Sequence, residues 1–138
     1  PFAKCEFGQE ERDAVNRVLS GNWLTSGPEC EAFEAEFANY IGRKYAICVN
    51  SGSSANLIAL SSLNLQTTAR ILTSACGFPA TLSPILHLGL HPILVDNDID
   101  THNADVFQIT KHVRSRTPNA VLIAHSLGNP IEMRDSFL

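Results

Sequence analysis

Residues 49–60 read VNSGSSANLIAL, in which an apolar strand ends, a turn of small residues follows and an apolar helix begins. At the carboxyl end of a strand, such a turn aims backbone N–H groups and hydroxyls at one point beside the positive end of a helix dipole. The stretch therefore predicts a site for an anion or phosphate group. The serines have a second explanation, because Ser51, Ser53 or Ser54 could instead cap the helix. From the residues alone the two explanations carry about equal weight.

The turn lacks the spacing of other phosphate and nucleophile motifs. It matches neither G-x-G-x-x-G nor G-x-x-x-x-G-K-[ST], which argues against a dinucleotide site or a P-loop. It also lacks the second glycine of G-x-S-x-G, and no acid completes a triad with Ser53 and His125. A serine hydrolase is therefore the least favoured function.

Outward from this turn, short apolar runs alternate with helix-length segments. Two helices are expected within residues 9–42, before any strand. The predicted strands are residues 45–49, 70–73, 92–95 and 120–124. The predicted helices between them are residues 54–63, 79–88 and 104–114, and Pro84 is expected to kink or shorten the second. This alternation over residues 45–138 predicts an α/β fold, a mainly parallel sheet with helices on both faces, in one domain covering residues 1–138.

Two further strand ends deliver side chains to the edge of the sheet where the serine turn lies. Phe78 follows the second predicted strand, and His125 follows the fourth. Open α/β sheets bind ligands at this edge. Phe78 could stack on a flat ring, although a phenylalanine before a helix is more often core. His125 could donate, accept or transfer a proton, although a lone histidine at a strand end is more often structural.

Composition excludes several classes of function. The 138 residues include 10 Lys and Arg against 14 Asp and Glu, a formal charge of −4, which does not fit a basic nucleic-acid-binding surface. No apolar run approaches the about 18 residues of a membrane span, and no secretory signal pattern opens the chain, so we expect a cytoplasmic protein. Asp96, Asp98 and Asp100 alternate as in a calcium loop, but Thr101 and Phe107 at positions six and twelve reject it. No metal site is expected.

Seven motifs, in order along essentially the whole chain, resemble the pyridoxal-phosphate-dependent sugar aminotransferases of the DegT and StrS type. They are GNWLTSG at 21–27, FEAEFA at 33–38, VNSGSSANL at 49–57, GFPAT at 77–81, VD at 95–96, NAD at 103–105 and HSLGNP at 125–130. Each alone is weak, whereas the ordered set is specific. The resemblance implies the N-terminal part of an aspartate aminotransferase-like (fold type I) large domain.

Residues 50–56, 77–81 and 127–130 look most like the 3-dehydrase branch, which acts on CDP-4-keto-6-deoxyglucose and related GDP sugars. The resemblance implies removal of the C3 hydroxyl of a nucleotide-linked 4-keto-6-deoxy sugar, in the biosynthesis of surface polysaccharide such as the lipopolysaccharide O-antigen. Two alternatives remain open: a nucleotide-sugar aminotransferase of the same family, and a non-catalytic remnant that binds a phosphorylated ligand.

The resemblance also implies roles for particular residues. The cofactor would be pyridoxal 5'-phosphate or pyridoxamine 5'-phosphate, with its phosphate on Gly52, Ser53 and Ser54 and its ring on Phe78. The nucleotide-sugar substrate would contact residues near the entrance and mouth of the site, namely Trp23, Thr25, Ser26 and His125.

The family's catalytic residues are expected beyond Leu138. They are the aspartate partner of the pyridine nitrogen and the Schiff-base lysine, or the histidine that replaces this lysine in 3-dehydrases. None of Lys4, Lys44 and Lys111 is placed to substitute for it. A new helix is expected to start after Pro130. We therefore expect residues 1–138 to be the front part of a longer homodimeric enzyme, or a chain that is stabilised by a partner. We expect this chain to be inactive alone.

Overall fold

The computed structural model describes residues 4–132, and its contacts divide the chain into two compact units, Pro1–Cys48 and Val49–Leu138. The single domain expected over residues 1–138 stays a prediction. The helix expected after Pro130 falls largely on residues 133–138, outside the described residues.

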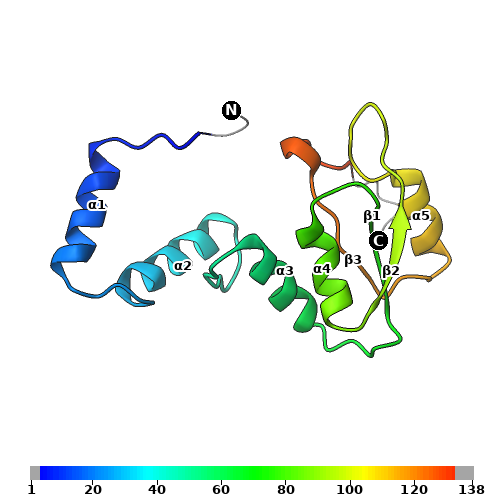
Figure 1. The fold of residues 1–138 in the computed structure, drawn as a ribbon, viewed down its shortest axis with the longest axis horizontal. Coiled ribbons are helices and arrows are strands. Elements are labelled where there is room, and N and C mark those ends of the chain that lie inside the picture. Colours follow the sequence, from blue (N-terminus) through cyan, green and yellow to red (C-terminus); the bar gives the residue numbers. More distant parts are fainter. Residues whose placement is uncertain (1–3, 133–138) are drawn as a thin grey trace. The chain divides into compact units, whose positions relative to one another are not determined.

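The first unit contains the two predicted leading helices, α1 (Gln9–Ser20) and α2 (Pro28–Tyr40) (Figure 1). α1 begins where the backbone N–H of Gly8 donates to the carboxylate of Glu11 at 2.6 Å. α2 begins with a proline, whose missing N–H costs nothing in the first helical turn. Both helices confirm the expectation from the sequence.

Residues 45–49, predicted as the first strand, form no strand in the described part of the chain. The backbone N–H of Cys48 donates to the carboxylate of Glu34 at 2.6 Å instead of to a neighbouring strand. Tyr45 and Ile47 have exposed side chains. The prediction was wrong because an apolar pattern favours extended backbone but cannot supply the hydrogen-bonded neighbour that makes it a strand.

The second unit is built on a parallel sheet of three strands in the order β2-β1-β3. The strands are β1 (Arg70–Ser74), β2 (His91–Val95) and β3 (Ala120–Val121) (Figure 1). β1 lies in the centre, with Ile71 opposite Pro92 on one side and Ala120 on the other. β3 is shorter than predicted: its last bond to β1 runs from Leu122 N to Leu72 O.

Helices cover both faces of this sheet, as predicted. They are α3 (Gly52–Ser61), α4 (Pro79–His87) and α5 (Val106–Arg114). Successive side chains of a strand point to opposite faces, so Ile71 and Leu72, both fully buried, enter two different cores. The core on the α3 and α4 side comprises Leu60, Ala69, Ile71, Ile85 and Leu90. The core on the α5 side comprises Leu72, Val95, Ala104 and Ile109.

The proline was expected to kink the helix or cut it short; α4 continues through Pro84 to His87, so it is not cut short, and the kink stays a prediction. Its missing N–H would leave the carbonyl of Ala80, four residues earlier, without a donor. The side-chain amide of Asn56 on α3 donates to that carbonyl at 3.1 Å.

None of the helices within residues 4–132 is long and apolar enough to cross a membrane. The cytoplasmic location stays a prediction.

Thr73 is fully buried in β1, and its hydroxyl has no hydrogen-bond partner among the described residues. An unsatisfied buried hydroxyl costs about 1–3 kcal/mol. Thr73→Val keeps the shape and removes the polar atom, so we expect the free energy of unfolding to rise by about 1 kcal/mol in urea denaturation. Thr110→Val is the control, because the Thr110 hydroxyl donates to Val106 O at 2.7 Å and its loss should bring no gain. A less stable Thr73→Val protein would show that the Thr73 hydroxyl is satisfied in solution.

Candidate functional site

The geometry of the turn before α3 shows which of its serines caps the helix and which is available to bind an anion. Ser51 is the helix cap, since its hydroxyl oxygen accepts from Ser54 N at 3.2 Å. The Ser54 hydroxyl donates to the side-chain carbonyl of Asn50 at 2.6 Å. The Ser53 hydroxyl makes no hydrogen bond within residues 4–132, and it is exposed. Capping therefore accounts for Ser51 and leaves Ser53 available to a ligand.

The start of α3 also leaves backbone donors unused. The Ser54 N–H is taken by the cap, and the Ala55 N–H donates to Ser51 O at 3.0 Å. The N–H groups of Gly52 and Ser53 have no partner in the described part of the chain, as is usual for the first helical positions. A Cβ built on Gly52 would meet no atom within 4 Å, so the space beside this turn is open.

A cavity of about 410 Å³ lies between the start of α3 and α4. Its walls are Ser53, Ser54, Leu57, Pro79, Ala80, Ser83, Pro84 and His87. Ser53 and Ser54 stand at the positive end of a helix, and the other walls combine the apolar Leu57, Pro79, Ala80 and Pro84 with Ser83 and His87, which suits a compact anion attached to a largely apolar body.

Phe78 caps the N-terminus of α4, directly after the turn that follows β1, and its side chain is 79% exposed. It is thus not a core residue. Phe78 lines a second cavity, of about 220 Å³, where the segments after β1 and β3 meet. Ser126 from the second of these segments lines it too, and Pro79 lines both cavities. The segments after β1 and β3 therefore meet at one cavity, as predicted. The serine turn lines the neighbouring cavity instead.

His125 follows β3 and is exposed, but it lines neither cavity. Its Nδ1 accepts from Ile131 N at 3.1 Å, so the neutral ring carries its proton on Nε2. No hydrogen bond joins His125 to Ser53 within the described residues, which leaves the hydrolase alternative without support. The residues Leu127 and Gly128, which follow in the same turn, have φ values of 53° and 79°. A leucine in this left-handed region stores local strain, here in the turn beside the cavity.

Two asparagines for which the sequence predicted no role hold this edge together. Asn103 is buried; its Oδ1 accepts from Ser126 N at 2.8 Å, and its Nδ2 donates to Asn129 O at 3.0 Å. Asn97 Nδ2 donates to Cys76 O at 3.2 Å. These amides connect the loop after β2 with the turns after β3 and β1. The signal in the sequence was an Asn- and Asp-rich loop directly after a strand, a composition typical of side chains that bond to backbone.

The aspartates of this loop form a turn. The Asp98 carboxylate accepts from Thr101 N at 2.8 Å, from the Thr101 hydroxyl at 2.9 Å and from Asp100 N at 3.1 Å. These bonds, those of Thr101 first, hold the pKa of Asp98 below its ordinary value. Residues 4–132 contain no cluster of three or more His, Cys, Asp or Glu side chains that could hold a metal ion.

In the first unit, Trp23, Thr25 and Ser26 lie in the loop between α1 and α2. Trp23 Nε1 donates to Ser26 O at 2.9 Å, and a Cβ on Gly27 would collide with the Trp23 ring, so a larger residue there would require Trp23 to move. Trp23 and Thr25 line a cavity of about 410 Å³, but Ser26 does not.

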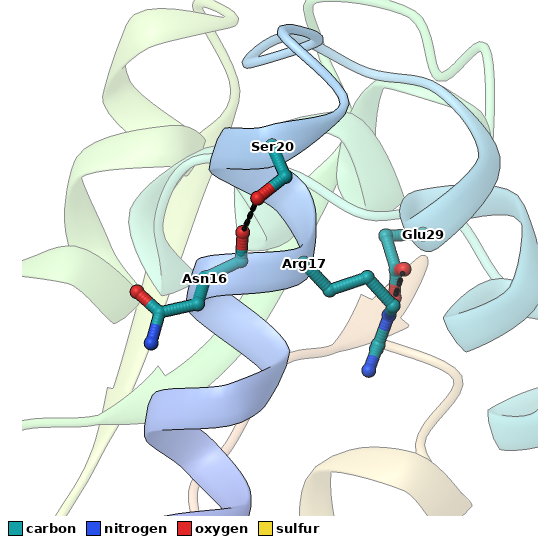
Figure 2. Close-up of polar contacts among 4 residues, drawn as sticks. All are labelled: Asn16, Arg17, Ser20 and Glu29. Atoms are coloured by element: carbon teal, nitrogen blue, oxygen red, sulfur yellow. Dashed lines mark hydrogen bonds and ion pairs between the residues drawn. The ribbon is translucent and has the colours of Figure 1, made fainter.

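The same loop is bridged by an ion pair between its flanking helices. Arg17 Nε lies 3.1 Å from Glu29 Oε1, and the Ser20 hydroxyl donates to Asn16 O on α1 at 2.8 Å; both contacts are drawn in Figure 2. The hydrogen bond and charge of Glu29 raise the pKa of Arg17. Both partners are exposed, so the pair contributes little to stability.

The roles of the two serines predict different effects on stability. Ser51→Ala removes the cap of α3 and should lower the free energy of unfolding by about 1 kcal/mol. Ser53→Ala removes a hydroxyl that bonds to nothing in the described protein and should change it by less than about 0.5 kcal/mol. Urea denaturation of the two variants makes the comparison. An equal loss for both would give Ser53 a structural role.

Comparison with known proteins identifies the family. The family model for the DegT/DnrJ/EryC1/StrS aminotransferase family matches residues 6–136. The dTDP-4-dehydro-2,6-dideoxy-D-glucose 3-dehydratase of Saccharopolyspora spinosa is 43% identical over 130 residues, 88% of this chain and 28% of that protein. The lipopolysaccharide biosynthesis protein RfbH of Salmonella typhimurium is 36% identical over 143 residues, 98% of this chain and 32% of that protein. The chain thus spans about a third of these relatives.

A solved structure agrees. The E. coli GDP-4-keto-6-deoxy-D-mannose-3-dehydratase with bound hydrated PLP matches with a TM-score of 0.76 and 32% identity, over 80% of this chain and 30% of that one. This likeness confirms the expected fold, the N-terminal part of a fold type I large domain. Because the family model covers nearly all of the sequence, this chain belongs to the DegT/DnrJ/EryC1/StrS aminotransferase family.

Proposed function

We propose that this chain provides the phosphate cradle and the ring platform of a sugar-modifying enzyme that uses pyridoxal 5'-phosphate or pyridoxamine 5'-phosphate. The supporting observation is the start of α3, where the Ser53 hydroxyl and the N–H groups of Gly52 and Ser53 have no partner within residues 4–132. Ser53 lines the cavity beside α4, and Gly52 directly precedes it in the chain.

The donors fit a phosphate in both charge and number. A phosphate ester carries close to two negative charges at neutral pH, and the start of a helix supplies a partial positive charge with unused N–H groups. Ser54 adds a second hydroxyl, whose single proton goes to the Asn50 side-chain carbonyl in this structure and must turn from it to reach a phosphate. Hydrogen bonds to a charged group contribute about 1.5–3 kcal/mol each.

Phe78 fits the aromatic ring of the same ligand. Its side chain is mostly exposed at the start of α4 and lines the cavity of about 220 Å³, which shares Pro79 with the cavity beside the serine turn. Offset stacking between aromatic rings contributes about 0.5–1.5 kcal/mol beyond the area buried, which would orient the ring rather than supply most of the affinity.

When bound, the cofactor would supply an amine that reacts with the sugar ketone and a conjugated ring that delocalises the electrons released when a proton is removed. This chain's own residues bind the phosphate and hold the ring in one orientation. Neither cavity is lined by a lysine. As the family resemblance implies, we propose that the residue that transfers the proton lies outside residues 1–138, in keeping with a chain that spans about a third of its relatives.

The substrate we propose is a nucleotide-linked 4-keto-6-deoxy sugar, and the reaction is 3-dehydration in the synthesis of surface polysaccharide, including the lipopolysaccharide O-antigen. Similarity to sugar 3-dehydratases and to RfbH supports this choice. The second candidate is amination of a nucleotide sugar, which the family match supports. We propose nucleotide-sugar contacts for Trp23, Thr25, Ser26 and His125, and a homodimer for the complete enzyme.

The reading frame after Leu138 distinguishes these reactions. A histidine at the position of the family's cofactor lysine supports 3-dehydration, whereas a lysine supports amination. A stop codon directly after Leu138 would favour the non-catalytic remnant.

The cradle is tested by removing its hydroxyls. We expect Ser53→Ala combined with Ser54→Ala to weaken binding of pyridoxamine 5'-phosphate about 10- to 100-fold, the loss of one or two charged hydrogen bonds. Equilibrium dialysis measures this, with pyridoxamine, which lacks the phosphate, as the ligand control.

The matched control variant is Ser83→Ala, because Ser83 lines the same cavity while its hydroxyl donates to Pro79 O at 2.7 Å. It should bind pyridoxamine 5'-phosphate like the unchanged protein. Unaltered affinity in the double serine variant would exclude the cradle from cofactor binding.

A further inference from the structure

Pro84 creates a local problem in α4 that the helix cannot solve by itself. The residue is buried in the middle of the helix, and it has no N–H to donate to the carbonyl of Ala80. A carbonyl left without a donor away from water costs free energy comparable to a lost hydrogen bond. The donor must therefore come from outside α4.

The donor is Asn56, whose Nδ2 lies 3.1 Å from Ala80 O in a partly buried contact. Asn56 belongs to the first half of α3, two residues after Ser54, and Ala80 lies two residues after Phe78. This contact thus joins the two helix starts that carry the serine turn and the exposed aromatic ring. α3 and α4 pack side by side in the second unit (Figure 1).

The two helices are held differently along their length. Further along, Leu60 of α3 and Ile85 of α4 belong to one apolar core. Apolar contacts have no preferred direction, so they fix how far one helix slides along the other less sharply than a hydrogen bond does. Within residues 4–132, Asn56 to Ala80 is the one side-chain hydrogen bond between α3 and α4. A hydrogen bond is directional and fixes that register.

We propose that Asn56 is a positioning residue: by replacing the N–H that Pro84 lacks, it holds Phe78 at a fixed place relative to Ser53. The identity of the ligand in this inference rests on the proposed function. The hydrogen bond from Asn56 to Ala80 is observed independently of it. Asn56 would align the Phe78 ring with the serine turn through its hydrogen bond to Ala80, and it would not contact the ligand.

The first test is a double-mutant cycle in stability, which needs no ligand. Asn56→Ala should raise the unfolding equilibrium constant about 5- to 30-fold, because it leaves the Ala80 carbonyl unpaired. Pro84→Ala restores an N–H at position 84, so Asn56→Ala should cost much less in that background. Urea denaturation of the four proteins measures the coupling. Equal costs in both backgrounds would overturn the replacement of the proline N–H by Asn56.

The second test compares pyridoxamine 5'-phosphate with inorganic phosphate, which lacks the ring. Asn56→Ala should weaken pyridoxamine 5'-phosphate about 2- to 10-fold through lost stacking on Phe78, and inorganic phosphate less than about twofold. The Asn56→Ala, Pro84→Ala protein should regain stability but not affinity, because its Ala80 carbonyl is paired within α4 and the link to α3 is still missing. A purely structural role predicts recovery of both.

Two results would overturn the positioning role: equal weakening of both ligands by Asn56→Ala, or recovery of pyridoxamine 5'-phosphate affinity in the double variant. Failure of the proposed function has a different signature, since the unchanged protein would then bind neither ligand. In that case Asn56 would have no ligand to align. The double-mutant cycle in stability would still decide whether Asn56 replaces the N–H that Pro84 lacks.

Discussion

The central position of β1 between two parallel neighbours is the constraint on which the second unit depends. Its side chains alternate between the two faces, so Ile71 anchors the core under α3 and α4 while Leu72 anchors the core under α5. The direction of β1 also decides where the chain emerges. Because parallel strands end at one edge, the segments after β1 and β3 meet there, with Phe78 and Ser126 lining one cavity.

Side-chain amides maintain this edge where the backbone ladder ends. Asn97 bonds to the turn after β1, Asn103 bonds to both ends of the turn after β3, and Asn56 joins α3 to α4. An amide suits this task because it donates and accepts at once, whereas a hydroxyl or carboxylate offers fewer complementary bonds to irregular backbone. The edge is therefore ordered by specific polar contacts, and among the described residues these contacts leave the Ser53 hydroxyl and the Phe78 ring available to a ligand.

Much of the fold could be predicted from the sequence, because the signals for helices are local. The spacing of apolar residues and the flanking Gly and Pro predicted α1 and α2 within a residue or two. Pairing is not local. Residues 45–49 carry a strand pattern but have no neighbour within the described residues, and only two residues of the last predicted strand pair with β1. α4 likewise continues past Pro84, and the donor that the proline lacks comes from Asn56, which is distant in sequence.

In the candidate site, too, local features could be predicted from the sequence, whereas features that depend on three-dimensional contacts could not. Its serines, Phe78 and His125 could be proposed from their places at strand ends and from the family resemblance. Their separate roles could not, because only the geometry shows that Ser51 is the cap and that Ser53 is without a partner in the described chain. Roles for Asn97 and Asn103 needed the three-dimensional contacts as well.

If the start of α3 is an anion site beside the Phe78 ring, its backbone N–H groups must respond to the ligand. An ¹H–¹⁵N NMR titration of the chain with pyridoxamine 5'-phosphate is the sharpest test, because it reports on each backbone N–H separately. We expect the largest shifts at the N–H groups of Gly52 and Ser53, accompanied by shifts of the Phe78 ring resonances. Saturation of binding with Gly52 and Ser53 unmoved, and the shifts elsewhere, would contradict an anion site at this turn.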